Sequence, residues 1–329
     1  MRKYFFIIIL SLFYSFAYAS ANITHQFIAR SVIPILPDKN LQNLLRNNLD
    51  AYLAGANYPD SGYVYGTHYG EDSHWDPFIY AFSDYIKEKY TYPELENPKL
   101  VAFLFGCATH RLSDDIVHGT FYPIMSLHDF SGDWLTDGTH SYGDIGIDLL
   151  LVIDKNQWFI GPSTWWVPVN DLVQVYRKMG KKEYTAKEIT WGSSIIFLLD
   201  YIEPMIAAPL YPYLQLKMPW TAKHYYNWSE GGILMNEINT SKYMMDLWNQ
   251  LHQKSSDKSF HFSNNKNDIH HGENNSLLLF STELLQKGLV NYSSRSNDDG
   301  SVEISLPIVT SYFEFNKLIN EFIENSLKK

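Results

Sequence analysis

The sequence contains a single cysteine, Cys107, among 329 residues, so an internal disulfide is excluded. It is also short of cationic residues: 26 Lys and Arg stand against 36 Asp and Glu, which gives a formal charge of −10 at pH 7. This balance argues against a protein that binds double-stranded nucleic acid, since such binding depends on neutralising phosphates. Charged residues make up 19% of the chain and hydrophobic ones 45%, which predicts a globular fold with a sizeable core. We expect a monomer.

Long apolar runs are missing too, except at the N-terminus. Arg2 and Lys3 precede a mostly apolar run, residues 5–16, and a small-x-small cleavage site ends at Ala19. This order is typical of a secretory signal peptide, and the run is too short to span a bilayer comfortably. The alternative is an N-terminal anchor that stays attached. We predict a signal peptide over residues 1–19.

Cleavage there would leave a mature chain of residues 20–329. Its formal charge is about −12, because cleavage removes Arg2 and Lys3. After residue 19 no apolar stretch reaches the length of about eighteen residues that a membrane-spanning helix needs, so we expect no transmembrane span in the mature chain. We predict a soluble protein that is secreted or periplasmic.

Hydrophobic periodicity predicts a mainly α fold, a single helical domain in which Gly and Pro fall mainly between the helices. Helices are expected over residues 40–53, 77–90, 99–118, 140–153, 169–179, 195–206, 233–251 and 312–327. Residues 254–275 are rich in Ser, Asn, Lys and His, which predicts a long exposed loop. Residues 302–306 have the pattern of a short strand, so we expect a minor irregular or short-strand segment towards the C-terminus.

Histidines and aspartates recur at one-turn spacing in two of these helices. His110, Asp114 and His118 lie four residues apart, and His140 and Asp144 repeat the spacing. On a helix the first three cover an arc of roughly 80°, with apolar residues on the opposite side. Imidazole nitrogens and carboxylate oxygens suit zinc, and residues four apart aim two donors at one point. The pattern therefore predicts a metal site on the polar face of an otherwise buried helix.

Two further donors, Asp60 and His74, lie beside turn-forming residues, where a side chain can be held at the edge of a cleft. Each alone would usually be structural, but together with the two helical sets they favour a metal site. Cys107 has no second cysteine nearby, so we interpret it as a small core residue.

At these residues the chain resembles the zinc-dependent phospholipase C/D family, most closely its glycosylphosphatidylinositol-specific phospholipase D branch. The matching stretches are residues 54–60, 73–78, 100–118, 140–144 and 165–172. Several motifs in the same order make the likeness specific. It covers nearly the whole mature chain, more weakly after residue 251.

The resemblance implies a mainly helical fold around three zinc ions. The first zinc would be held by Asp60, His74, His110 and Asp114, and the second by His118, His140 and Asp144. The third would take His25, the other oxygen of Asp114, and the amine and carbonyl of Ser20 as the first mature residue. Two features depart from bacterial phospholipase C: the four-residue step from Asp114 to His118, which the phospholipase D branch shares, and Asp144 in place of a glutamate, which the nuclease branch shares.

The implied function is a secreted phospholipase in which zinc-activated water hydrolyses the phosphodiester of a phospholipid or glycosylphosphatidylinositol, with Asp60 both a ligand and the residue that orients the nucleophile. The same chemistry serves C-type and D-type cleavage. The alternatives are a single-strand-specific zinc nuclease and a non-catalytic lipid- or metal-binding relative.

Aromatic residues in the second half either pack the core, which is the favoured interpretation, or rest at a lipid interface; they are Trp158, Phe159, Trp165, Trp166, Trp220, Tyr225, Tyr226 and Trp228.

Overall fold

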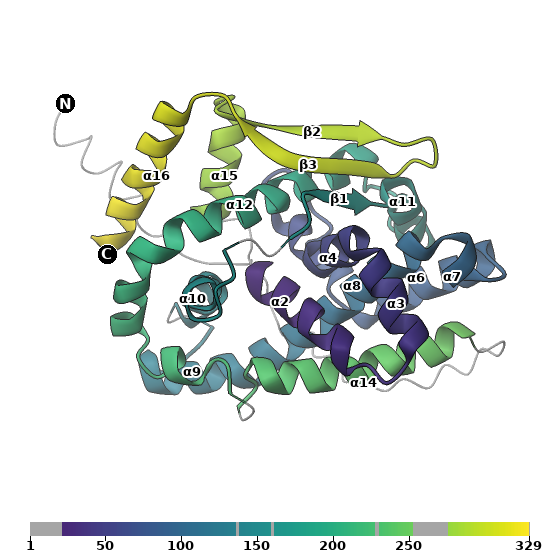
Figure 1. Ribbon diagram of the computed structural model, residues 1–329, viewed down its shortest axis with the longest axis horizontal. Helices are drawn as coiled ribbons and strands as arrows, with labels where there is room; N and C mark the ends of the chain where they lie inside the picture. Colours follow the sequence, from purple (N-terminus) through teal and green to yellow (C-terminus); the bar gives the residue numbers. More distant parts are fainter. Residues whose placement is uncertain (1–21, 136–137, 159–160, 228–229, 253–275, 329) are drawn as a thin grey trace.

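A computed structural model describes residues 22–135, 138–158, 161–227, 230–252 and 276–328. The expected signal peptide, Ser20, the expected loop 254–275, Phe159 and Trp228 lie outside the described residues. The fold is mainly helical with one small sheet, as the sequence predicts (Figure 1). Its helices are α2 Asn22–Val32, η2 Ile33–Ile35, α3 Lys39–Asn47, α4 Leu49–Asn57, η3 Pro59–Tyr63, α5 Gly70–Ser73, α6 Asp76–Lys89, α7 Pro93–Glu96, α8 Pro98–Ile116, η4 Val117–Phe121, α9 Tyr122–Asp129, α10 Thr139–Asp154, α11 Val169–Lys178, α12 Ala186–Lys217, α13 Thr221–His224, α14 Ile233–His252, α15 Ser276–Gln286 and α16 Tyr312–Leu327.

Helix α8 runs through the interior and packs closely against α4. Its N-terminus is capped by Asn97, whose side chain accepts a hydrogen bond from the backbone N–H of Leu100. The two helices approach so closely that a Cβ at Gly106 would lie 2.1 Å from the carbonyl oxygen of Tyr52. Only glycine fits such a contact, and it brings the α4 backbone up to the side chains that end α8.

The face of α8 that carries the predicted ligands lies inside the protein. From Leu100 to Arg111 the helix is buried on all sides, so its polar residues face the interior of the protein. The helix also ends at Ile116, and His118 lies in a π-helical turn, η4, that leads into α9. Such turns are rare inside helices and often occur at functional sites.

Helix α12 is much longer than the expected 195–206 because three prolines, Pro204, Pro209 and Pro212, lie inside it. Proline removes a helical hydrogen bond, so sequence reasoning ends a helix there. Among the described residues, α12 alone is long and apolar enough to cross a bilayer, but 67% of its apolar window is buried inside the protein. A core helix of this kind passes the same test, so the observation is weak evidence for a span.

A three-stranded antiparallel sheet lies beside α12, in the order β1-β3-β2. Strand β1 is Thr164–Val167, β2 is Val290–Ser296 and β3 is Val302–Val309. The register places Trp165 opposite Ile304. The expected strand 302–306 is therefore confirmed as part of β3, whereas β1, β2 and α15 were not expected. The expected helix 40–53 is two helices, α3 and α4, which meet at Asn48, where the backbone leaves the helical region.

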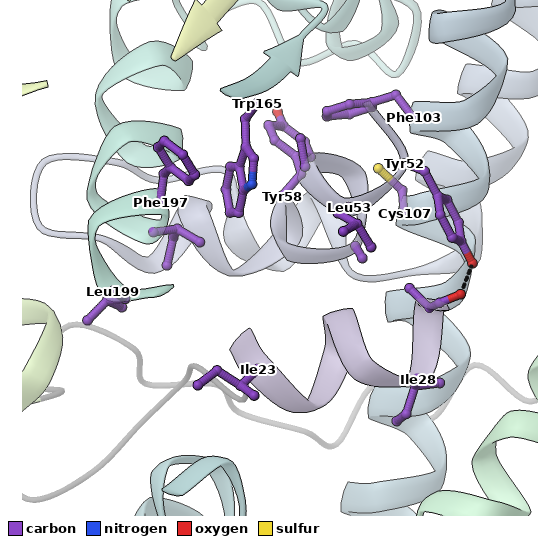
Figure 2. Packing of buried hydrophobic residues seen from close by; sticks show 14 of the residues in the cluster. Ile23, Ile28, Tyr52, Leu53, Tyr58, Phe103, Cys107, Trp165, Phe197 and Leu199 are labelled. Carbon is purple, nitrogen blue, oxygen red and sulfur yellow. Dashed lines mark hydrogen bonds between the residues drawn. The ribbon is translucent and has the colours of Figure 1, made fainter. Parts of the chain in front are cut away.

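The core lies between α2, α4, α8, β1 and α12 (Figure 2). Trp165 of β1 packs on Phe197 of α12 with ring centroids 4.7 Å apart. Cys107 is fully buried, and burial raises the pKa of its thiol, in keeping with a core residue. The favoured interpretation of the aromatic residues holds for Trp165, Trp166 and Tyr225, which are buried, but Trp158 is 46% exposed.

Candidate metal centre

The eight described side chains that the sequence singles out as metal ligands are all buried and come together from six elements. They are His25 of α2, Asp60 of η3, His74 at the end of α5, His110 and Asp114 of α8, His118 of η4, and His140 and Asp144 of α10. The ninth, Ser20, lies outside the described residues.

The first group consists of Asp60, His74 and His110. The Nε2 atoms of His74 and His110 lie 3.1 Å apart, and Asp60 Oδ1 lies 3.3 Å from His74 Nε2 and 3.8 Å from His110 Nε2. The opposite ring nitrogens are anchored on the backbone: His74 Nδ1 donates to the Gly70 carbonyl at 2.7 Å, and His110 Nδ1 to the Ala56 carbonyl at 2.8 Å.

These anchors fix the tautomers. A backbone carbonyl only accepts, so each Nδ1 carries a proton and each Nε2 faces the other ring and Asp60. Two Nε2 atoms 3.1 Å apart beside a carboxylate form a site that can hold a proton or a metal ion. Hydrogen bonds from the other ring nitrogen to a carbonyl are also the usual support of metal-binding histidines. The arrangement therefore fits a cation.

His25 extends the first group towards α10. Its ring stacks on that of His110 with centroids 3.9 Å apart, and its Nδ1 lies 2.8 Å from the Ser113 hydroxyl. Its Nε2 lies 4.0 Å from Asp114 Oδ1. Ser113 holds the ring in place, which is a role that the sequence pattern does not reveal.

The second group consists of His118, His140 and Asp144. Asp114 Oδ1 lies 3.3 Å from His118 Nε2, so Asp114 stands between the two groups. Asp144 Oδ1 lies 3.9 Å from His118 Nε2, and its Oδ2 lies 3.1 Å from His140 Nδ1. The Tyr122 hydroxyl donates a hydrogen bond to Asp144 and holds that carboxylate in place.

The charges around Asp144 favour an ionised carboxylate. Burial by itself raises the pKa of Asp144, but His140 and His118 outweigh it and bring the pKa to about 2. Burial also dominates at His25 and lowers its pKa, against the charges of Asp60 and Asp114. At His74 burial is again the largest effect, but the hydrogen bond with Asp60 and the nearby carboxylates outweigh it and raise the pKa. The negative potential of the carboxylates around His74 favours a positive charge at that position.

Donor spacing agrees with metal binding. His25, Asp60 and His110 offer ligand atoms within 4.8 Å of one another, and so do His74, His110 and Asp114. A cavity of about 20 Å³ is lined by His25, Asp114, His118 and Asp144 among others, which is room for about one water molecule. The nitrogen and oxygen donors suit zinc.

Asp148, one turn beyond Asp144, does not continue the ladder of ligands. It accepts hydrogen bonds from the backbone N–H groups of Ile23 and Thr24 and so holds the start of α2. The sequence shows that Asp148 lies four residues after Asp144, but it does not show the contact with α2, because that contact joins residues more than 120 positions apart.

Comparisons with known proteins match the same region. The profile of the family described as "Zinc dependent phospholipase C" matches residues 24–187. Human phosphatidylinositol-glycan-specific phospholipase D is 35% identical over 207 residues, which cover 59% of this chain and 24% of the relative. The bovine protein is 32% identical over the same shares. The protein of the same name from Dictyostelium discoideum is 25% identical over 306 residues, 87% of this chain and 32% of the relative.

The chain thus spans about a quarter to a third of the length of these curated relatives. No solved structure matches it. The matched residues include every described member of the metal centre, from His25 to Asp144. With its helical fold and its buried set of histidines and aspartates, the chain belongs to the zinc-dependent phospholipase C/D family, a family of phosphodiester hydrolases.

Proposed function

We propose that the protein is a secreted zinc-dependent phospholipase that hydrolyses the phosphodiester of a phospholipid or a glycosylphosphatidylinositol. The observation that carries the proposal is the pair of anchored imidazoles, His74 and His110, whose Nε2 atoms face each other beside Asp60. Two imidazole nitrogens and a carboxylate oxygen at these distances form a donor set that suits zinc. The relatives named above act on phosphatidylinositol-glycans, which supports a lipid phosphodiester as substrate.

The proposed ligands divide among three zinc ions. Asp60, His74, His110 and Asp114 would hold the first, and His118, His140 and Asp144 the second. His25, Asp114 and the amine and carbonyl of Ser20 would hold the third. Asp114 serves two ions because it stands between the two groups, 3.3 Å from His118 Nε2 and 4.0 Å from His25 Nε2.

Bound zinc supplies a water molecule whose pKa is lowered to about 7 and positive charge to offset the phosphoryl oxygens. The chain's own residues orient the water molecule and the histidine rings. Asp60 accepts a hydrogen bond from the attacking water and aims it at phosphorus. The Ala56 and Gly70 carbonyls hold the rings of His110 and His74, and burial of the whole set excludes bulk water.

Export and chemistry are linked in this proposal. Residues 1–19 form the signal peptide, residues 20–329 form one domain, and the mature protein is a monomer. Cleavage after Ala19 creates the α-amine of Ser20, five residues before His25. The site is therefore complete only after processing outside the cytoplasm.

The test uses purified mature protein incubated with phosphatidylcholine, phosphatidylinositol, a lipid-anchored protein and single-stranded DNA, each with and without chelator. We expect zinc-dependent release from a lipid substrate, and the mass of the product tells C-type from D-type cleavage. His110→Ala and His118→Ala should abolish it, whereas His68→Ala, an exposed histidine outside the centre, should not. Hydrolysis of DNA alone would establish the nuclease instead, and zinc binding without any hydrolysis would establish the non-catalytic relative.

A further inference from the structure

Residues 156–170, 204–216 and 304–313 are segments of ten or more positions that carry no charged residue. The first leads into β1, the second forms the later part of α12, and the third joins β3 to α16. In the fold they meet, since α12 contacts β1, β3 and α16. Figure 1 shows β3 turning into α16 beside α12. A charge-free region of this size stands out in a chain with 36 acidic residues.

Large apolar side chains are exposed where these segments meet. They are 37% to 77% exposed, and we call them the apolar corner: Trp158, Met205, Leu306, Ile308, Tyr312 and Phe313. Single exposed apolar residues are ordinary, but six at one place are characteristic of an interaction surface.

The members of the corner are neighbours in space. Trp158, Met205 and Leu306 line one pocket of about 250 Å³ together with Tyr201. Ile308 follows Leu306 on the same face of β3. Tyr201 also packs on Phe315 of α16, the helix whose first two residues are Tyr312 and Phe313, with ring centroids 6.5 Å apart.

The pocket is linked to the metal centre through Asp200 and Gln26. Its lining includes Asp200, whose carboxylate accepts hydrogen bonds from the side chains of Gln26 and Asn57. Gln26 directly follows His25 in α2. Burial raises the pKa of Asp200 to about 8, against the Gln26 hydrogen bond and the charge of Arg30, so the carboxyl is largely uncharged at neutral pH. The pocket of the apolar corner is thus lined by an uncharged carboxyl group, and the three segments around it carry no charge.

We propose that the apolar corner docks onto the surface of a zwitterionic membrane and places the metal centre next to its lipid substrate. The inference rests on the proposed function, which puts the substrate in a bilayer. Trp and Tyr favour the interface between hydrocarbon and headgroups, and an uncharged surface enters it without the cost of stripping water from ions. The net charge of −10 disfavours anionic lipid, so the membrane that fits is neutral overall.

The direct test measures sedimentation of the zinc-loaded protein with phosphatidylcholine vesicles, and product release is followed in the same samples so that binding is separated from hydrolysis. The variant Ile308→Ser/Phe313→Ser removes two exposed members of the corner. Its control, Tyr92→Ser/Leu95→Ser, removes two equally exposed apolar residues, one just before α7 and one within it. We expect the wild type and the control to bind alike and the corner variant to bind about tenfold more weakly or worse. Equal binding of both variants, or no binding by the wild type, would overturn the proposal.

Other outcomes decide the identity of the partner. Adding phosphatidylserine should weaken binding at low salt; binding that requires phosphatidylserine and vanishes in salt would contradict a neutral surface. Light scattering that shows a wild-type dimer and a monomeric corner variant would assign the corner to self-association. Hydrolysis of a short-chain, monomeric phospholipid should be equal in both variants. If no lipid is hydrolysed but vesicle binding still depends on the corner, the proposed function fails while the docking surface stands.

Discussion

Asp148 of α10 accepts two hydrogen bonds from Thr24 of α2, one from its backbone N–H at 2.8 Å and one from its hydroxyl at 2.5 Å. A carboxyl group at this place satisfies free N–H groups at the beginning of a helix. Because His25 is the next residue, this contact between two helices also sets the position of a proposed zinc ligand.

Asp148→Ala should therefore weaken both the fold and the metal centre. The change leaves buried donors without an acceptor, which costs on the order of 1–3 kcal/mol of unfolding free energy. Urea denaturation measures the loss, and competition with a zinc chelator measures the expected drop in zinc affinity. The control is Asp298→Ala, which changes an exposed acid in a turn. A normal zinc affinity in Asp148→Ala would show that α2 is held by other contacts.

An N-terminal extension should remove one zinc ion. A free α-amine has a pKa of about 7.7–8.0 and must lose its proton to bind zinc. A chain with one extra residue before Ser20 has its amine out of place, so we expect one zinc fewer per chain and little activity. Elemental analysis compares it with protein that starts at Ser20. Active protein found to start at another residue would contradict the assignment.

Asp200 should make stability depend on pH. Its pKa is raised to about 8 in the fold, compared with about 3.9 in an unfolded chain. The folded state therefore binds the proton more tightly, and this contribution to stability is fully present below about pH 4 and is lost as the pH rises towards 8. Asp200→Asn cannot ionise, so its stability relative to the wild type should increase between pH 5 and pH 8. Urea unfolding at several pH values measures the trend, with Asp298→Asn, a substitution of an exposed acid in a turn, as control. A constant difference would show that Asp200 ionises normally.

Gly106→Ala should separate α4 from α8. The new Cβ would lie 2.1 Å from the Tyr52 carbonyl oxygen, a backbone atom that cannot move aside. Overpacking of this kind costs about 1–3 kcal/mol. Zinc affinity should fall as well, because His110 Nδ1 donates to Ala56 on α4. Gly119→Ala is the control for stability, since its Cβ meets nothing within 4 Å. Thermal unfolding would show whether the two substitutions differ as expected.

The sequence predicts the helices best where apolar periodicity is clean and a cap or a glycine marks the end. Helix α16 begins and ends where expected, and α10 extends only one residue further at each end. The prolines inside α12 make the predicted helix too short, because a buried helix can contain proline when tertiary packing supports it. Strand β1 is not predicted because its partner, β3, lies far along the chain and gives no local signal. Strand β2 is not predicted because it has no apolar alternation: Val290 is its only buried residue.

For the metal centre, spacing and resemblance identify the residues that come together, because two residues four positions apart on a helix lie on the same face. The groups that hold these residues leave no local pattern. Ser113 on His25, Tyr122 on Asp144 and Asp148 on Thr24 are ordinary polar residues in the sequence and acquire their roles only through contacts between distant segments.

The metal centre joins six elements that span residues 25 to 144, in a chain that has no disulfide. Bound ions would therefore act as the protein's cross-links as well as its chemistry. Scarcity of zinc should then shorten the life of the protein in the presence of proteases as well as abolish its activity, so that its persistence would follow the supply of the metal.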